Sequence, residues 1–201
     1  MSRTIAISSV LSALFFAALL APGCSPGGIG DPCTPEDEYT DEFSGYSVDE
    51  VNVESRSFQC VTRICLVNHF QGRVSCPYGN GQSTINQRNN QDMNLTCYVP
   101  GDQTRPIKGA VDPQVQTRRA NDAVYCSCRC KGPDKSARYC ECPSGFQCEN
   151  LVEQLDVGGA QLAGSYCIRE GTRYDKSVNT SNVCHYNAKD CGDVDEINQP
   201  K

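Results

Sequence analysis

The chain has 201 residues, carries a formal net charge of −6 and contains 15 cysteines but no tryptophan. Its few aromatic residues and its many Asn, Asp, Gly, Ser and Gln residues exclude a large hydrophobic core, because such a composition cannot bury enough apolar surface to offset chain entropy. The acidic charge and the lack of a nucleic-acid motif exclude DNA or RNA as the expected partner.

Residues 1–23 have the pattern of a signal peptide. Arg3 supplies one positive charge, an uncharged apolar run extends from Ile5 to Ala21, and small residues follow it. This order is typical of a secretory leader. A transmembrane helix needs about 20 predominantly apolar residues, whereas this run is shorter, contains three serines and ends at Pro22. The sequence therefore predicts an exported chain and not a membrane-spanning one.

The end of this leader resembles the lipobox of bacterial lipoproteins. In that family the leader ends in Leu, small, small, Cys, and Leu20, Ala21, Pro22, Gly23 and Cys24 match this pattern loosely, with Ala21 and Pro22 as departures. The resemblance implies that Cys24 receives a diacylglyceryl thioether before cleavage and an acyl chain such as palmitate on its amino group afterwards. Two or three acyl chains hold a protein on a membrane almost permanently.

The residue after the cysteine bears on the location. In the lipoprotein family, an Asp directly after the lipidated cysteine tends to retain the protein at the inner membrane, and Ser25 stands there in this chain. The resemblance therefore implies a lipid-anchored protein of the cell envelope, at the outer membrane.

Cysteine parity agrees with this interpretation. Without Cys24, fourteen cysteines remain: Cys33, Cys60, Cys65, Cys76, Cys97, Cys126, Cys128, Cys130, Cys140, Cys142, Cys148, Cys167, Cys184 and Cys191. Export to an oxidising compartment favours disulfides over free thiols, so this even set predicts seven bridges of open connectivity. The expected fold is small, disulfide-rich and mainly β, with short hairpins, long loops and little helix in the mature chain.

Residues 24–55 are expected to form a lipidated N-terminus and an acidic tether. The segment Ser25 to Gly30 is rich in Gly and Ser and predicts a flexible linker. Residues 31–50 then carry eight acidic side chains and no basic one, which is typical of a solvated, extended spacer. No register of this block fits the D-x-[DN]-x-[DN]-G pattern of a calcium loop.

Residues 56–100 predict a first cysteine-rich β module. The stretches SFQCVTRICLVNHF and RVSCPY are rich in β-branched and aromatic residues, and the break at Gln71 and Gly72 is short enough for a hairpin. Residues 78–94 are polar and predict a loop, and LTCYVP predicts a further short strand that ends at Pro100.

Residues 101–121 are expected to form a linker between two modules. Pro106 and Pro113 interrupt it, and it holds a basic group of Arg105, Lys108, Arg118 and Arg119. Because the mature chain is acidic and has no nucleic-acid motif, this group is expected to be a solvated loop.

Residues 122–201 predict a second, denser cysteine-rich β module. Residues two apart share one face of a strand, so Cys126, Cys128 and Cys130 are expected on one strand of a hairpin and Cys140 and Cys142 on the returning strand. The turn KGPDKSA supplies the reversal. Later, ENLVEQLD predicts a helical turn or two, and GSYCIRE predicts a strand.

One short stretch resembles a known motif. The run from Cys140 to Phe146 is similar to the C-x-C-x-x-G-F corner of epidermal-growth-factor-like modules, but Cys148 follows too soon for that family's spacing. The resemblance implies a local corner only, in which Gly145 permits the tight turn and Phe146 packs on neighbouring disulfides.

The two histidines do not indicate a catalytic site. His69 falls in a predicted strand, where it is expected as an ordinary polar residue, and neither it nor His185 is accompanied by a nucleophile motif such as G-x-S-x-G. His185 follows Cys184, which could activate a thiolate in principle, but an exported cysteine in an even set is expected to be bridged. No enzyme activity and no cofactor are predicted.

Two function classes follow from the sequence. The first is a membrane-anchored, non-catalytic binding or structural module of the envelope, whose partners are the lipid bilayer through acylated Cys24 and an unidentified protein or envelope ligand. The alternative is a thiol-redox or metal-binding protein that uses the cluster from Cys126 to Cys148, since clustered Cys-x-Cys units offer thiolates to soft metals. Free thiols or bound metal in the native protein distinguish the two.

Overall fold

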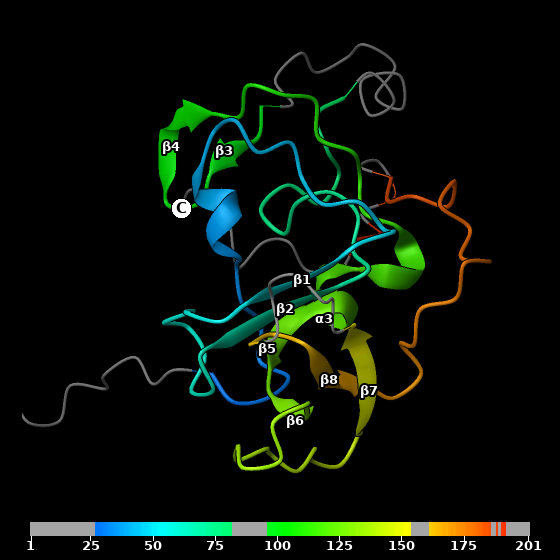
Figure 1. Ribbon diagram of the computed structural model, residues 1–201. Helices are drawn as coiled ribbons and strands as arrows, with labels where there is room; N and C mark the ends of the chain where they lie inside the picture. The colour runs from blue at the N-terminus through cyan, green and yellow to red at the C-terminus, as the bar shows by residue number, and fades with distance from the viewer. Residues whose placement is uncertain (1–26, 82–95, 154–160, 186–187, 189, 192–201) are drawn as a thin grey trace, which may run out of the picture.

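A computed structural model describes residues 27–81, 96–153, 161–185, 188 and 190–191 (Figure 1). Within these residues, eight short strands form three small antiparallel sheets, and the named helical elements are one short α-helix and two 3-10 turns. Seven disulfides hold the sheets and loops together. The expected small, disulfide-rich and mainly β fold is therefore confirmed.

The first sheet lies at the centre of the described chain and has the order β1-β2-β5. Its strands are β1 (Val51–Glu54), β2 (Ile64–Asn68) and β5 (Val124–Ser127). Leu66 and Tyr125 are paired across β2 and β5 and pack in one apolar cluster, whereas the neighbouring pair Cys65 and Cys126 packs in another. Because side chains alternate along a strand, β2 and β5 are covered on both faces.

The remaining elements lie around this sheet. The second sheet has the order β6-β8-β7, formed by Arg129–Lys131, Gly164–Arg169 and Phe146–Val152. The third pairs β3 (Tyr98–Val99) with β4 (Asp102–Pro106). The 3-10 turns η1 and η2 span Glu36–Tyr39 and Gln116–Arg118, and α3 spans Ala120–Ala123.

The predicted boundary between two modules is crossed by the central sheet. Strand β5 follows the expected linker but is hydrogen-bonded to β2, which precedes it. The disulfide between Cys60 and Cys126 joins the same two regions. The segments before and after residues 101–121 therefore share one sheet and one covalent bridge.

The predicted hairpin around the second cysteine cluster is wrong in its pairing. Cys126 lies on β5, whose partner is β2, and Cys130 lies on β6, whose partner is β8. Cys140 and Cys142 lie in irregular chain and not on a returning strand. Strands β5 and β6 pair instead with β2 and β8, which lie far from them in the sequence.

Two further predictions of secondary structure are also wrong. The stretch RVSCPY forms turns held by isolated bridges, among them Arg73 with Cys76, and no strand. Residues 149–152, expected as a helical turn, extend β7 along β8, because sheet pairing overrides their helical propensity. The predicted strands around β2, β3 and β8 are confirmed, and residues 82–94 of the predicted loop lie outside the described residues.

The acidic segment 31–50 is part of the packed structure and not a solvated spacer. Cys33, Tyr46 and Val48 are buried, and the Glu38 side chain is fully buried. The Glu38 carboxylate accepts hydrogen bonds from the amides of Val74 and Ser75 at 2.6 and 2.9 Å. The segment 31–50 is therefore held in the fold by its buried apolar residues and by the hydrogen-bonded Glu38 carboxylate, although its acidic composition predicts a solvent-exposed segment.

The counter-charge of Glu38 comes from Arg73, whose side chain is also fully buried. The Arg73 guanidinium donates to the carbonyls of Glu38 and Phe43 and lies 3.8 Å from the Glu38 carboxylate. Burial raises the pKa of the Glu38 carboxyl, and the hydrogen bonds from Ser75 and Val74 and the charge of Arg73 oppose this rise. The pair therefore ties the acidic segment to the turn after β2.

The basic group of the expected linker is only partly solvated. Arg118 is buried and donates to the carbonyls of Asn68, His69 and Thr172. Lys108 is exposed and forms ion pairs with Asp41 and Glu42. The expectation of a solvated loop is wrong for Arg118, which links three segments through their backbones.

Candidate functional site

Every cysteine that the structure describes is paired. The bridges are Cys33–Cys65, Cys60–Cys126, Cys76–Cys97, Cys128–Cys140, Cys130–Cys148, Cys142–Cys167 and Cys184–Cys191. Cys24 lies outside the described residues. Because the other fourteen cysteines are partners of one another, none of them is left to bridge Cys24 within the chain.

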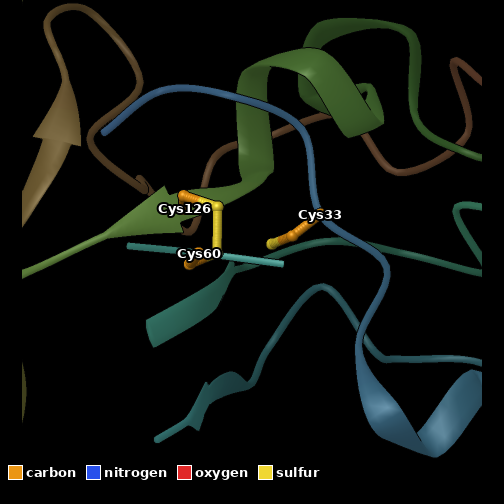
Figure 2. A group of neighbouring side chains, drawn as sticks. All are labelled: Cys33, Cys60 and Cys126. Carbon is orange, nitrogen blue, oxygen red and sulfur yellow. A yellow bond between two sulfur atoms is a disulfide. The ribbon is translucent and has the colours of Figure 1, made fainter. Parts of the chain in front are cut away.

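Sulfur atoms nevertheless gather at three places. Figure 2 shows one of them, where the sulfur of Cys33 lies beside the Cys60–Cys126 bridge and the three sulfurs are within 4.8 Å of one another. The other two groups are Cys128, Cys140 and Cys167, and Cys130, Cys142 and Cys167. Soft metals bind thiolates, and in these groups each sulfur belongs to a disulfide. The sulfurs of the predicted thiol or metal cluster are therefore bonded in disulfides.

The two histidines have structural surroundings. Cys184 is bridged to Cys191, so it offers His185 no thiolate. His69 follows β2 in the left-handed conformation with a φ of 52°, not within a strand. Its Nδ1 lies 3.0 Å from the carbonyl of Val48, and its ring stacks on Tyr174 with the centroids 3.8 Å apart. His69 thus joins the end of β2 to two distant loops.

This arrangement predicts a pH effect on stability. Burial lowers the pKa of His69 below its usual 6.5, and the charge of Arg118 adds to the effect, whereas the Val48 carbonyl and Asp49 oppose it. Above pH 6.5 the ring is neutral in both states, and below it the unfolded chain takes up the proton first. The free energy of unfolding should therefore fall as the pH drops below 6.5.

The measurement compares denaturant unfolding of the parent and of His69→Asn between pH 7.5 and 5, a range of about 2.5 units around the ordinary histidine pKa. Asn tolerates the left-handed backbone but does not titrate. A difference in free energy between the two proteins that is constant across this range would contradict the prediction.

The chain enters the described structure as a fixed segment. The Gly27 amide donates to the Gln59 carbonyl at 2.6 Å, and the Gly27 carbonyl accepts from the Val61 amide at 2.9 Å. Further on, the Gly30 amide donates to the Cys126 carbonyl at 2.8 Å. The predicted flexible linker is therefore wrong for residues 27–30, because their backbone groups are hydrogen-bonded to the fold.

Gly30 is required at its position by two features. Its φ of 94° lies in the region that favours glycine, and a Cβ built there would come within 2.7 Å of the Phe146 ring. Phe146 packs edge-on against Tyr125 with the ring centroids 5.8 Å apart. In the corner before Phe146, Gly145 has a φ of 82°. The Phe146 ring itself lies against Tyr125 and Gly30.

The turn that joins β1 to β2 receives this N-terminal segment. Gln59 holds the turn to Thr34, since its side-chain amide donates to the Thr34 carbonyl at 2.7 Å and accepts from the Thr34 amide at 3.0 Å. Cys60 fixes the turn to β5 through its disulfide. The β1–β2 turn is thus fixed to Thr34 through Gln59 and to Cys126 through Cys60.

Large apolar side chains are exposed at this turn. Among the described residues, the exposed large hydrophobic side chains are Phe58 (81 % exposed), Val61 (63 %) and Tyr39 (44 %). Phe58 and Tyr39 line one hollow of about 430 Å³, and Val61 lies on the same turn as Phe58. We call Tyr39, Phe58 and Val61 the apolar tip. Its residues fall in segments whose patterns predict a spacer and a strand, so no signal in the sequence singles them out.

Charged groups surround the apolar tip. The Arg63 guanidinium lies over the Phe58 ring, 4.1 Å from its centroid. Arg56, Glu36 and Glu54 line the hollow. The apolar tip is therefore bordered by both signs of charge.

The fold and these features define a small disulfide-rich β protein with an exposed apolar tip beside its N-terminal entry. Comparison with known proteins gives no matching family model, no matching curated sequence and no matching solved structure. None of the helices in the described part of the chain is long and apolar enough to cross a membrane.

Proposed function

We propose that this chain is an exported lipoprotein that is anchored in the cell envelope, at the outer membrane, through acylated Cys24. It acts there as a non-catalytic binding or structural module. The observation that carries this proposal is the cysteine pairing: seven bridges use all fourteen described cysteines and leave Cys24 without a partner in the chain. A disulfide-rich fold also agrees with export to an oxidising compartment.

The surroundings of the chemical groups support a non-catalytic role. The cysteines of the Cys126–Cys148 cluster are bonded in disulfides, so they offer no free thiolate to a metal ion. The His69 ring is engaged with the Val48 carbonyl and the Tyr174 ring. We therefore expect the described chain to bind a partner through its surface and not to carry out a reaction.

Intact mass and acyl labelling of the protein from its native membrane test the anchor. The expected mature chain begins at Cys24 and carries a diacylglyceryl group and an amide-linked acyl chain. Cys24→Ala should remove label and lipid mass together. A mature chain that carries no lipid at Cys24 would overturn the proposal.

A further inference from the structure

The distance between the proposed anchor and the apolar tip is set by covalent geometry. Three residue steps separate Cys24 from Gly27, and a fully extended chain spans at most about 11 Å over three residues. Gly27 is hydrogen-bonded to Gln59 and Val61. An acylated Cys24 therefore has its lipid attachment within a short reach of the turn that carries Phe58 and Val61.

We propose that the apolar tip inserts into the interface of the bilayer that holds acylated Cys24. This inference rests on the proposed function, and it adds a second membrane contact that fixes how the protein lies on the lipid. Phe58 and Val61 are apolar and exposed, and Tyr39 combines an apolar ring with a hydroxyl group. Such side chains gain free energy by leaving water for the boundary between headgroups and acyl chains.

Of the charges around the apolar tip, the two arginines fit the headgroup region, and the carboxylates of Glu36 and Glu54 must stay in its watery part. Arg63 covers one face of the Phe58 ring, and Arg56 lies along the hollow beside it. Arginine side chains extend their charged ends to the polar layer while their stems lie on apolar surface. Insertion to the depth of one or two side chains therefore leaves the guanidinium groups among the lipid phosphates.

The turn is already ordered before it meets the membrane. The Gln59 clamp on Thr34 and the Cys60–Cys126 bridge fix its backbone. An ordered contact surface loses little conformational entropy on binding. The body of the protein is thus expected to rest on the bilayer at the β1–β2 turn and not to hang from a long linker (Figure 1).

The chain has no tryptophan, so a single one reports on its own surroundings. The test uses full-length Phe58→Trp, in its acylated form, in phosphatidylcholine vesicles with ordinary or brominated acyl chains. We expect blue-shifted emission and a loss of intensity with the brominated lipid. The matched control is Gln103→Trp on the exposed strand β4, which Figure 1 shows away from the β1–β2 turn. Its emission should remain that of water-exposed tryptophan in both lipids.

Two further variants separate the possible outcomes. Adding Val61→Asp to Phe58→Trp should reduce the quenching, because a carboxylate opposes insertion. Cys24→Ala made without the leader, residues 1–23, should carry no lipid and give no vesicle signal. If mass shows the lipid but brominated lipid leaves Phe58→Trp unquenched, the membrane contact is wrong while the anchor stands, and a protein partner becomes the occupant of the apolar tip. If no lipid is found, the anchor itself is wrong.

Discussion

Replacing Cys60 and Cys126 together with alanine is expected to lower the free energy of unfolding by about 4 kcal/mol, the value that loop-closure entropy gives for a long loop. These two residues are 66 positions apart, and both are buried. Their bridge joins the β1–β2 turn to β5. Without it, the unfolded chain regains the conformational entropy of a long closed loop, which raises the entropy cost of folding. Replacing both residues avoids a free thiol that could exchange with neighbouring bridges. Denaturant unfolding without reductant measures the effect.

The control is the double replacement Cys184→Ala and Cys191→Ala. That bridge closes only 7 positions, so the same entropy argument predicts a loss of about 2 kcal/mol. Thiol titration should find no reactive thiol from the described cysteines in the parent or in either variant. If both variants lose the same free energy, loop length does not govern the contribution of these bridges, and chain entropy does not explain the effect of Cys60–Cys126.

Local patterns in the sequence were sufficient for the fold class and for several strands. The β-branched, aromatic and cysteine residues of Ile64–Asn68 and Gly164–Arg169 mark β2 and β8, and most of these residues are buried. The even cysteine set after Cys24 indicated seven bridges, and the structure forms seven. These features depend on composition and near neighbours alone.

Features that depend on residues far apart in the sequence could not be predicted from local patterns. Cys140 and Cys142 alternate as strand residues do, yet their segment is irregular. The strand that pairs with β6 is β8, which begins more than thirty residues after β6 ends. A local alternation cannot reveal which distant strand is the partner. The N-terminal entry at Gly27 was missed for the same reason, since its hydrogen-bond partners are Gln59 and Val61.

The burial of Glu38 was not predicted, because the acidic residues around it in the sequence indicate a solvated segment. Glu38 lies in a run of acidic residues with no basic one, which is typical of a solvated segment. Its counter-charge, Arg73, is 35 positions away, and the amides that bind it belong to Val74 and Ser75. Nothing near Glu38 in the sequence marks this pairing.

Arg73→Met should therefore destabilise the protein strongly, by about 3–5 kcal/mol, the usual loss when one partner of a buried ion pair is removed. The substitution leaves the Glu38 carboxylate without its counter-charge and the carbonyls of Glu38 and Phe43 without their donor. Lys108→Ala is the control, because it breaks an exposed ion pair with Asp41 and Glu42 and should change stability little.

The loss of unfolding free energy in Arg73→Met should also depend on pH. Burial already raises the pKa of Glu38, and removing Arg73 raises it further, so the folded variant holds a proton that the unfolded chain releases above about pH 4.5. The stability of the variant is then fullest below that pH and is lost as the pH rises through the folded pKa. Unfolding at pH 5 and pH 8 measures this, and adding Glu38→Gln to Arg73→Met should remove the dependence. A deficit equal at both pH values would mean that Glu38 does not carry the buried charge.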